Sequence, residues 1–417
     1  MVNDLPPLLH LHRQPRPALG RSALAEHEPR LGERIDIRSL LGIALRLGAP
    51  STGRLRLATQ ADISELLAEA ARSIEGQRFG LAFLLSEWTE IVDAWQITDR
   101  EAYRQVPRLG RKTRIGEAQR DLIWPIFERL RKDLSERGLQ TQSELFTNLA
   151  RRFAESPTPI FDFIVADEAQ DLSVAQLRFL VALGKRRPDS LFFTGDLGQR
   201  IFQQPFSWRA LGIDLRGRSR TLHVNYRTSQ QIRSKADRLL GPELSDVDGI
   251  VEKRYQTISV LNGPPPLLRI FKDRLEEEKA VAAWIAARLA EGIKPHEFGI
   301  FVRSDRELER AQAAASKAGL PARILDDRVE TEFGFASIGT MHLAKGLEFR
   351  AVVVMACDEG VLRLEERLET LGDDADLEEV YNTERQLLYV ACTRARDWLM
   401  VSGIRNPASE FLADLRI

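Results

Sequence analysis

Two adjacent carboxylates follow a short apolar run in the middle of the chain. The run Phe163-Ile-Val165 consists of residues that favour β-structure, and after Ala166 the sequence turns to charge at Asp167 and Glu168. Such a run is typical of a strand that is buried on both faces of a parallel sheet. Ligands of open α/β sheets bind outside the carboxyl ends of the strands, where paired carboxylates can hold Mg²⁺ and polarise a water. The pattern therefore predicts a site for Mg²⁺ and a nucleotide phosphate.

The same region also has a purely structural interpretation. Ser173 and Gln176 have the spacing of a capping box, and Asp171 could equally cap the helix that follows. Acidic residues favour a helix N-terminus, so Asp167 and Glu168 would then do no chemistry. Periodicity alone does not decide between the two interpretations.

The stretch Asp167 to Asp171, Asp-Glu-Ala-Gln-Asp, resembles the Walker B box of superfamily 1 helicases of the UvrD/Rep type. Four further segments downstream resemble motifs of this family in the same order, and the resemblance extends from about residue 85 to the C-terminus. It implies an ATP-dependent DNA helicase, or single-stranded DNA translocase, with 3′ to 5′ polarity. It also implies that Asp167 holds Mg²⁺ and that Glu168 positions the attacking water.

The segment Phe192 to Phe202 looks like motif III of the family. By that resemblance Gln199 contacts the γ-phosphate, since an amide can donate to phosphate and accept from water. Phe206 and Trp208 follow, and the family uses the corresponding Trp as a platform on which DNA bases stack. Taken alone, Trp208 could equally be an anchor in a core or an interface.

The segment Val224 to Ser229, Val-Asn-Tyr-Arg-Thr-Ser, resembles motif IV. The resemblance assigns Tyr226 to adenine and Arg227 to the γ-phosphate. The residue types suit these roles, because a ring can lie against a base and a guanidinium fork can hold phosphate oxygens. The structural alternative is an ordinary turn after a strand.

The segment Thr340 to Phe349, Thr-Met-His-Leu-Ala-Lys-Gly-Leu-Glu-Phe, is the most specific match and resembles motif V. The resemblance implies that Gly346 lets the backbone approach a phosphate and that Glu348 receives the ribose hydroxyls. It places Thr340 and His342 on the DNA backbone. In isolation, His342 would be interpreted as a half-buried histidine with its hydrogen bonds satisfied.

The segment Glu384 to Arg396 resembles motif VI and predicts a helix that packs on a second sheet. Arg394 would be the arginine finger, a residue that neutralises charge in phosphoryl transfer and is worth roughly 10³ to 10⁵ in rate. Arg396 could serve only the helix dipole.

The P-loop that the family places upstream of its Walker B box is not found. The pattern Gly-x-x-x-x-Gly-Lys-Ser/Thr does not occur, and Lys112 is the first lysine of the chain. We therefore expect a product that begins after the P-loop, with a first lobe that lacks an early strand and its phosphate cradle. The alternative function is a non-hydrolysing single-stranded DNA-binding or regulatory helicase fragment, to which a partner supplies the P-loop.

The elements that must position these residues alternate between strand and helix after residue 155. Alternation of this kind predicts parallel sheets. The expected fold is α/β, with two RecA-like parallel-sheet lobes around a nucleotide cleft, the first incomplete at its N-terminus, and a helical insertion. The expected domains are 1–59, an irregular or helical remnant of the first lobe; 60–150, the helical insertion; 151–218, the first lobe; and 219–417, the second lobe.

Composition limits the class of protein. The 417 residues, 43% of them hydrophobic, suffice for two or three domains, and 60 basic against 61 acidic residues give a formal charge of -1. A surface for single-stranded or partly duplex DNA must therefore be local. Cys357 and Cys392 have no metal-type spacing and are expected to fill cores in a reducing cytoplasm. No membrane span or targeting segment is evident in the sequence. ATP and Mg²⁺ are the expected cofactors. The sequence does not identify a protein partner.

Overall fold

The structure is a computed structural model, and the chain forms two compact units. It describes residues 8–12, 35–48, 56–74, 79–106, 115–157, 160–184, 189–200, 207–245, 248–249, 251–253, 257–326, 329–362, 374–405 and 409–416. The first unit comprises residues 1–196 and 202–215, and the second comprises residues 197–201 and 216–417.

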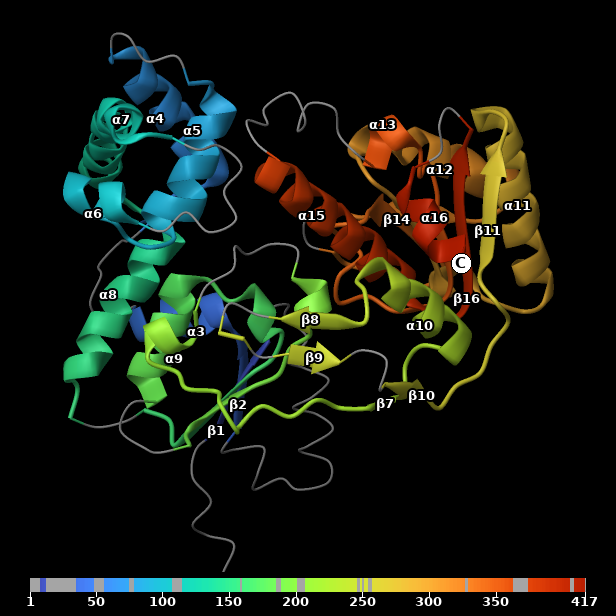
Figure 1. Ribbon diagram of the computed structural model, residues 1–417, viewed down its shortest axis with the longest axis horizontal. Coiled ribbons are helices and arrows are strands. Elements are labelled where there is room, and N and C mark those ends of the chain that lie inside the picture. Colours follow the sequence, from blue (N-terminus) through green and yellow to red (C-terminus); the bar gives the residue numbers. More distant parts are fainter. Residues whose placement is uncertain are drawn as a thin grey trace, which may run out of the picture. The chain divides into compact units, whose positions relative to one another are not determined.

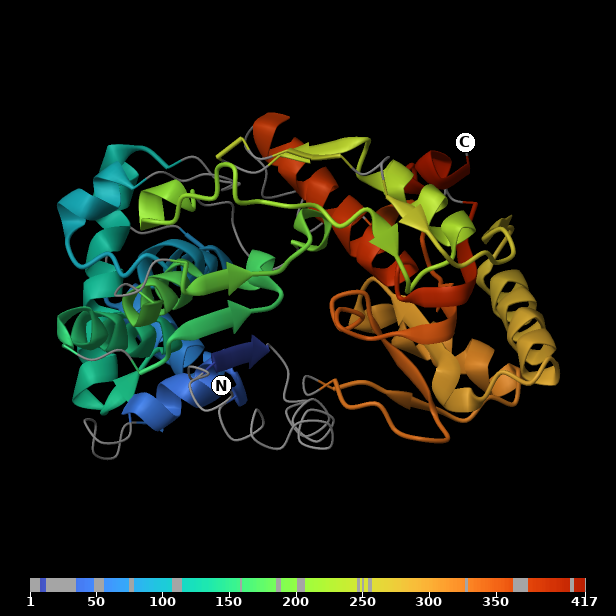
Figure 2. The same cartoon turned by 90° about the horizontal axis from the view of Figure 1, so that it is seen from below.

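The first unit contains a parallel sheet of four strands in the order β2-β1-β5-β6. Figure 2 shows arrows of this sheet pointing in the same direction. The strands are β1 (Leu8–His12), β2 (Ile35–Ser39), β5 (Phe163–Ala166) and β6 (Leu191–Phe193). A core of apolar side chains joins β5 to the helices α3 (Leu40–Gly48), α8 (Gln142–Glu155) and α9 (Val174–Gly184). This packing fixes where the carboxyl end of β5 lies.

The expectation for the N-terminal residues was wrong. Residues 1–59 were expected to be irregular or helical and to lack an early strand, yet β1 and β2 belong to the sheet. Leu9 of β1 pairs with Asp36 on one side and with Ile164 on the other. Histidines alternate with leucines in Leu-Leu-His-Leu-His, which obscures the apolar signal, and the ladder partners lie far away in the sequence.

A helical block lies between β2 and β5 in the sequence, as expected for an insertion (Figure 1). Its elements are β3 (Arg56–Leu57), α4 (Gln60–Arg72), α5 (Leu81–Glu87), the π-helix η1 (Trp88–Asp93), α6 (Arg100–Gln105), α7 (Glu117–Glu136) and β4 (Leu139–Gln140). The rings of Tyr103 and Trp124 stack with centroids 5.4 Å apart, and Phe127 meets Tyr103 edge-on. The Tyr103 hydroxyl donates to the buried Glu87 carboxylate at 2.7 Å, so these two polar groups of the core are paired.

The second unit is built on a parallel sheet of six strands in the order β11-β16-β15-β12-β14-β13. The strands are β11 (Leu267–Phe271), β12 (Phe298–Val302), β13 (Ala322–Ile324), β14 (Ala336–Thr340), β15 (Phe349–Val354) and β16 (Ala395–Ile404). All five residues of β12 are buried, which explains why the strand reads as a continuous apolar run.

Helices cover both faces of this sheet. Side chains alternate along β15, so Val352 and Val354 pack in one core while Ala351 and Val353 pack in another. The first core includes α10 (Gln230–Ala236), α15 (Asp374–Cys392) and α16 (Phe411–Arg416). The second includes α11 (Arg274–Ala290) and α12 (Leu308–Lys317), and Figure 1 shows α11 beside β11. The predicted class, α/β with two parallel sheets and a helical insertion, is confirmed.

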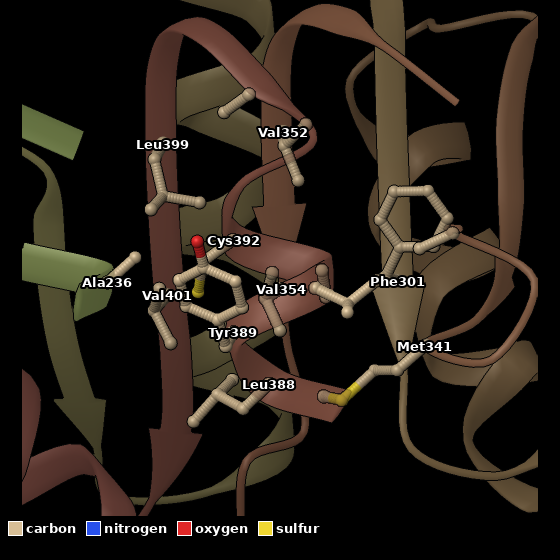
Figure 3. Packing of buried hydrophobic residues seen from close by; sticks show 14 of the residues in the cluster. Ala236, Phe301, Met341, Val352, Val354, Leu388, Tyr389, Cys392, Leu399 and Val401 are labelled. Atoms are coloured by element: carbon tan, nitrogen blue, oxygen red, sulfur yellow. The ribbon is translucent and has the colours of Figure 1, made fainter. Parts of the chain in front are cut away.

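Figure 3 shows the first of these cores, where Leu388, Tyr389 and Cys392 of α15 lie against Val354 and Val401 of the sheet. Cys357 and Cys392 are fully buried, as expected of core residues. The packed face of α15 carries the residues that precede Arg394, so the position of that arginine depends on this core.

The remaining elements of the second unit are small. The short strand β7 (Val224–Asn225) pairs with β10 (Ile258–Ser259). The described residues between Tyr226 and Thr340 add an antiparallel hairpin of β8 (Glu243–Ser245) and β9 (Val251–Lys253) to the helices and strands of this unit. Within the described part of the chain, no helix has the length and apolar character needed to cross a membrane.

Candidate functional site

In the first unit, Asp167 and Glu168 lie directly after β5, at its carboxyl end, as the sequence predicted. Glu168 has a left-handed backbone, with φ 55° and ψ 40°, a conformation that is costly for a residue with a side chain. The Asp167 Oδ1 atom accepts from the Glu168 N–H at 2.9 Å and from the Thr194 hydroxyl. A sharp turn therefore presents both carboxylates at the edge of the sheet.

Gln170 and Gly195 join the loop after β5 to the loop after β6. The Gln170 amide donates to the Glu168 carboxylate, and its Oε1 atom accepts from the Asp196 N–H at 3.1 Å. A side chain at Gly195 would place its Cβ 2.5 Å from the same Oε1 atom. Sequence reasoning missed this role of Gln170, although an amide inside Asp-Glu-Ala-Gln-Asp was the available signal.

The oxygens around Asp167 fit a Mg²⁺ ion. Mg²⁺ prefers one or two carboxylates, completed by water and phosphate oxygens, over a closed protein cage. Among the described residues, no group of three or more His, Cys, Asp and Glu side chains could hold a metal. Asp167 and the Thr194 hydroxyl beside it supply oxygens of the kind that Mg²⁺ prefers.

The predicted DNA platform of this unit is partly built into its core. Trp208 is half-buried, and its ring centroid lies 5.2 Å from that of Phe193, a residue of β6. The buried part of the Trp208 ring supports its interpretation as a core anchor. The exposed part remains available for a stacked base. Phe206 lies outside the described residues.

In the second unit, two predicted phosphate contacts meet at one backbone carbonyl. The Leu347 oxygen accepts from the Arg227 guanidinium and, at 3.4 Å, from the Arg394 Nη1 atom. Arg227 Nε also lies 3.0 Å from an oxygen of Glu348. The sequence segments around residues 227, 348 and 394 therefore converge in the fold, as their predicted roles require.

Gln199 joins this cluster from the short segment Leu197–Ile201, which packs with the second unit. Its side-chain oxygen accepts from Arg394 Nη2 at 3.1 Å, and its backbone oxygen accepts from Lys345. Arg394 is 2% exposed and also donates from Nε to the Val390 oxygen at 2.9 Å. Sequence reasoning did not assign Lys345, whose position in Ala-Lys-Gly was the available signal.

The other predicted residues of this unit lie nearby in the chain but differ in their surroundings. Gly346 has φ 80°, a backbone conformation that glycine adopts without strain. Thr340 ends β14, and the half-buried His342 follows in the turn. Tyr226 is 74% exposed, so its ring is accessible.

The cluster around Leu347 lies at the amino ends of β15 and β16. The Phe349 N–H, at the start of β15, donates to the Arg394 oxygen at 3.0 Å, and Arg394 precedes β16. Thr340 lies instead at the carboxyl end of β14. The structure therefore separates the predicted DNA-backbone residue Thr340 from the predicted phosphate residues by the length of a strand.

Arg396 forms hydrogen bonds with Asp397, its neighbour in the sequence. Its Nε and Nη2 atoms donate to the Asp397 carboxylate at 2.9 and 3.0 Å. These hydrogen bonds hold the pKa of Asp397 below its usual value. Arg396 thus belongs to a surface ion pair next to the cluster.

Comparison with known proteins finds a family model that matches part of the second unit. Residues 326–406 match the family described as UvrD-like helicase C-terminal domain. The ATP-dependent DNA helicase UvrD1 of Mycobacterium leprae is 38% identical over 100 residues, which are 22% of this chain and 12% of that protein. PcrA of Bacillus subtilis, also an ATP-dependent DNA helicase, is 35% identical over 103 residues, or 22% of this chain and 13% of that protein.

UvrD2 of Mycobacterium tuberculosis, a further ATP-dependent DNA helicase, is 30% identical over 166 residues, which are 38% of this chain and 23% of that protein. In each of these relatives the matched segment covers less than a quarter of the full length. A solved C-terminal domain of a possible DNA helicase from Lactobacillus plantarum covers 46% of this chain at 23% identity, with a TM-score of 0.32.

Proposed function

We propose that the chain is an ATP-dependent DNA helicase or single-stranded DNA translocase, because residues 326–406 of its second unit match the family of UvrD-like helicase C-terminal domains. We propose 3′ to 5′ polarity on the same family resemblance. The relatives named above are ATP-dependent DNA helicases of the UvrD and PcrA type, which supports this class of activity.

The observation that carries the proposal is the meeting of Arg227 and Arg394 at the Leu347 carbonyl, with Gln199 beside them. Each guanidinium has five N–H donors in a planar fork, a geometry that matches phosphate oxygens. Three donor side chains from separate chain segments gather in one place, as the recognition of a γ-phosphate requires. In this proposal the two arginines exchange their contacts with protein oxygens for contacts with the nucleotide.

In the first unit, Glu168 is the residue that we propose to orient the attacking water. Its left-handed backbone and the Gln170 amide hold its carboxylate in one place, so little reorganisation is needed. Asp167 would hold Mg²⁺ with the Thr194 hydroxyl beside it. The ion would neutralise charge on the phosphate oxygens.

Tyr226, Gly346 and Glu348 complete the proposed nucleotide contacts. The exposed ring of Tyr226 is available to lie against adenine. Gly346, whose positive φ leaves the backbone uncovered, is available for a phosphate, and the half-exposed Glu348 is available for the ribose hydroxyls. Because Glu348 pairs with Arg227, nucleotide binding would break an ion pair that is already formed.

For DNA we propose Trp208, Thr340 and His342 as contacts, together with Phe206. A single base stacked on an aromatic ring contributes roughly 1 to 3 kcal/mol. The half-buried Trp208 supports a smaller contribution than a fully exposed ring would, since one part of it packs on Phe193.

A second function is favoured by one observation on the sequence, the missing Gly-x-x-x-x-Gly-Lys-Ser/Thr pattern. A chain without that lysine and its ring of backbone donors would lose much of its hold on the β- and γ-phosphates. The alternative is therefore a protein that binds single-stranded DNA without turnover, or that hydrolyses ATP only with a partner that supplies the loop.

The experiment that separates the two functions measures ATP hydrolysis with and without single-stranded DNA, for the intact chain and for Glu168→Gln. We expect DNA-stimulated turnover that is lost in the variant, while binding of a fluorescent oligonucleotide is unchanged. Salt-sensitive oligonucleotide binding with no turnover by either protein would favour the alternative and exclude the helicase proposal for the chain alone.

A further inference from the structure

The second unit has a basic segment, residues 216–220, whose sequence is Arg-Gly-Arg-Ser-Arg. The chain leaves the first unit at residue 215, and the strand β7 begins at Val224. All nine residues from 216 to 224 are exposed, so the side chains of the basic segment face solvent and do not belong to a core. The segment is separate from all the residues proposed above to bind nucleotide or DNA.

The basic segment lies within a stretch of the sequence that has a strong excess of positive charge. Residues 197–236 contain eight lysines and arginines and a single acidic residue, Asp214. The whole chain has 60 basic and 61 acidic residues, so this excess is a local property. A local basic surface attracts polyanions even where the protein as a whole is nearly neutral. The charge therefore points to an anionic ligand.

Exposure distinguishes the arginines of the basic segment from others in the same stretch. Arg233 is largely buried and lies 2.7 Å from an oxygen of Asp237, so its charge serves the fold. The carboxylate nearest in the sequence to the basic segment is that of Asp214, which is itself exposed. An exposed ion pair contributes at most about 1 kcal/mol. A phosphate can therefore replace a carboxylate at these arginines at little cost.

The backbone of the basic segment is also accessible. Gly217 lies between two of the arginines and has φ 71°, a left-handed conformation that glycine adopts without strain. A Cβ built on Gly217 would meet no heavy atom of the described residues within 4 Å. An extended polyanion can therefore approach the chain closely between Arg216 and Arg218.

The residue types favour a chain of phosphates as the ligand. A guanidinium presents its N–H donors in a planar fork that can bind two oxygens of one phosphate. Three such forks in five residues suit a ligand with several phosphates in a row. Proteins that hold single-stranded nucleic acid combine positive charge of this kind with aromatic rings on which bases stack. Trp208, the proposed base platform, precedes the basic segment in the chain, and Arg209 next to it is exposed.

We propose that residues 216–220 bind the phosphodiester backbone of single-stranded DNA, with their guanidinium groups on separate phosphates. This inference rests on the DNA binding in the proposed function, to which it adds a contact surface, and it does not depend on ATP turnover. Because the contacts are made to phosphates, binding at the segment is independent of base sequence and weakens as salt is added.

The test removes the charge of the basic segment and compares the result with an equal loss of charge elsewhere. The first variant combines Arg216→Gln, Arg218→Gln and Arg220→Gln. The control variant changes three exposed residues on β11, on α11 and between them, by Arg269→Gln, Lys272→Gln and Lys279→Gln. Binding of a fluorescent oligothymidylate is followed by anisotropy over a range of NaCl concentrations, and circular dichroism confirms that both variants fold.

We expect the affinity of the first variant for the oligonucleotide to fall by about tenfold or more at low salt. The slope of the logarithm of the binding constant against the logarithm of the salt concentration should become shallower by about 2. Each phosphate contact to a single strand contributes about 0.7 to that slope, and three contacts are removed. The control variant should keep the slope of the intact chain.

A label on the basic segment tests where the oligonucleotide binds without removing any charge. Cys357 and Cys392 are fully buried, so a fluorescent maleimide should react first at the thiol introduced by Ser219→Cys. Ser316→Cys, at an exposed position of α12, is the matched control. We expect the emission of the label at residue 219 to change with the same midpoint as the anisotropy, and the emission of the label at residue 316 to stay constant.

The possible outcomes separate this inference from the proposed function. If the intact chain binds the oligonucleotide and the first variant keeps its salt slope, this inference is overturned and the proposed DNA binding stands. Equal responses of the two labels would overturn it as well. Polyglutamate that binds as tightly as the oligonucleotide, and loses affinity in the first variant, would assign the segment to an acidic protein surface instead. No binding of the oligonucleotide by the intact chain would reject the proposed DNA binding and this inference together.

Discussion

Arg303 and Glu384 form a buried bidentate ion pair that fixes α15 on the sheet of the second unit. Arg303 directly follows β12, and its Nη2 atom lies 2.6 Å from Glu384 Oε1, while Nε contacts the other oxygen. Their side chains are 4% and 0% exposed. Eight residue steps lead from Glu384 to Cys392, the last residue of α15, a helical rise of about 12 Å, and this rise approaches the length of a five-residue strand. The helix therefore runs along the sheet, from the carboxyl end of β12 to the amino end of β16.

Glu384→Gln should destabilise the second unit strongly, because Arg303 would keep its charge in a buried place without a counter-charge. Breaking a buried pair in this way typically costs about 3 to 5 kcal/mol of the free energy of unfolding. Urea unfolding followed by fluorescence should show a lower midpoint for the transition of this unit.

The matched control for that measurement is Glu136→Gln, which breaks the exposed pair with Lys132 on α7. Exposed pairs contribute little, and we expect a change below about 1 kcal/mol. Replacing both buried partners, by Arg303→Met with Glu384→Leu, should recover much of the stability, since no charge is then left unpaired. Similar small losses for Glu384→Gln and Glu136→Gln would show that burial of the pair is not what matters.

Gly346→Ala should cost about 1 to 2 kcal/mol of stability, because φ 80° places a Cβ against the following carbonyl. Gly346→Asn serves as the control at the same position, since asparagine tolerates the left-handed region and should lose less. Thermal unfolding of the three proteins gives the ranking. Equal stability of the alanine and asparagine variants would exclude backbone conformation as the reason for this glycine.

A strand could be predicted from the sequence where a local pattern of residues determines it, and not where pairing with distant residues determines it. The strand β5 was predicted because an apolar run of β-formers is a local property. β1 was not, because what makes Leu8–His12 a strand is its pairing with residues far along the chain. Pairing of that kind leaves little trace in a sequence of alternating leucine and histidine.

The candidate site was predictable to the extent that side-chain types determine it. Arg227, Glu348 and Arg394 were selected by type and order, and they do converge. The atom on which the two arginines converge is a backbone oxygen, that of Leu347, and no residue type reveals it. Gln170 was overlooked for a related reason, because its role arises only where the loops after β5 and β6 meet.

The buried thiols should be unreactive in the folded chain and should make its stability fall at high pH. Burial raises the pKa of Cys392 to about 12, and the pKa of Cys357 is also raised by burial. At pH 8 the thiolate of Cys392 is then about a thousandfold rarer than in the unfolded chain, because three pKa units separate the two states. Iodoacetamide labelling followed by mass spectrometry should modify both cysteines only under denaturing conditions.

The sign of the pH effect follows from the raised pKa. The folded chain keeps the Cys392 proton up to about pH 12, whereas the unfolded chain releases it near the ordinary thiol pKa of 9.0. The stabilising contribution is therefore complete below pH 9.0 and is lost as the pH rises towards 12. Cys392→Ala should remove this part of the pH dependence. Fast labelling of Cys392 in the folded protein at pH 8 would contradict its burial.

The sequence that follows β1 provides the sharpest test of nucleotide binding. β1 adjoins β5, the strand that directly precedes Asp167, and runs parallel to it, and the sequence after His12 continues to Gly20-Arg21-Ser22. A P-loop has a first glycine five residues before the second glycine of its Gly-Lys-Ser or Gly-Lys-Thr ending, whereas here Pro15 stands at that position and Arg21 replaces the lysine. We expect Arg21→Lys to raise ATP affinity or turnover and Arg21→Ala to lower both, because a lysine ammonium serves as a compact charge for the β- and γ-phosphates.

Arg72→Lys on α4 is the control for a general effect of exchanging arginine for lysine. Binding of a fluorescent ATP analogue with Mg²⁺ measures the series, and equal affinities for the lysine, alanine and parent proteins would exclude this triplet from the nucleotide site.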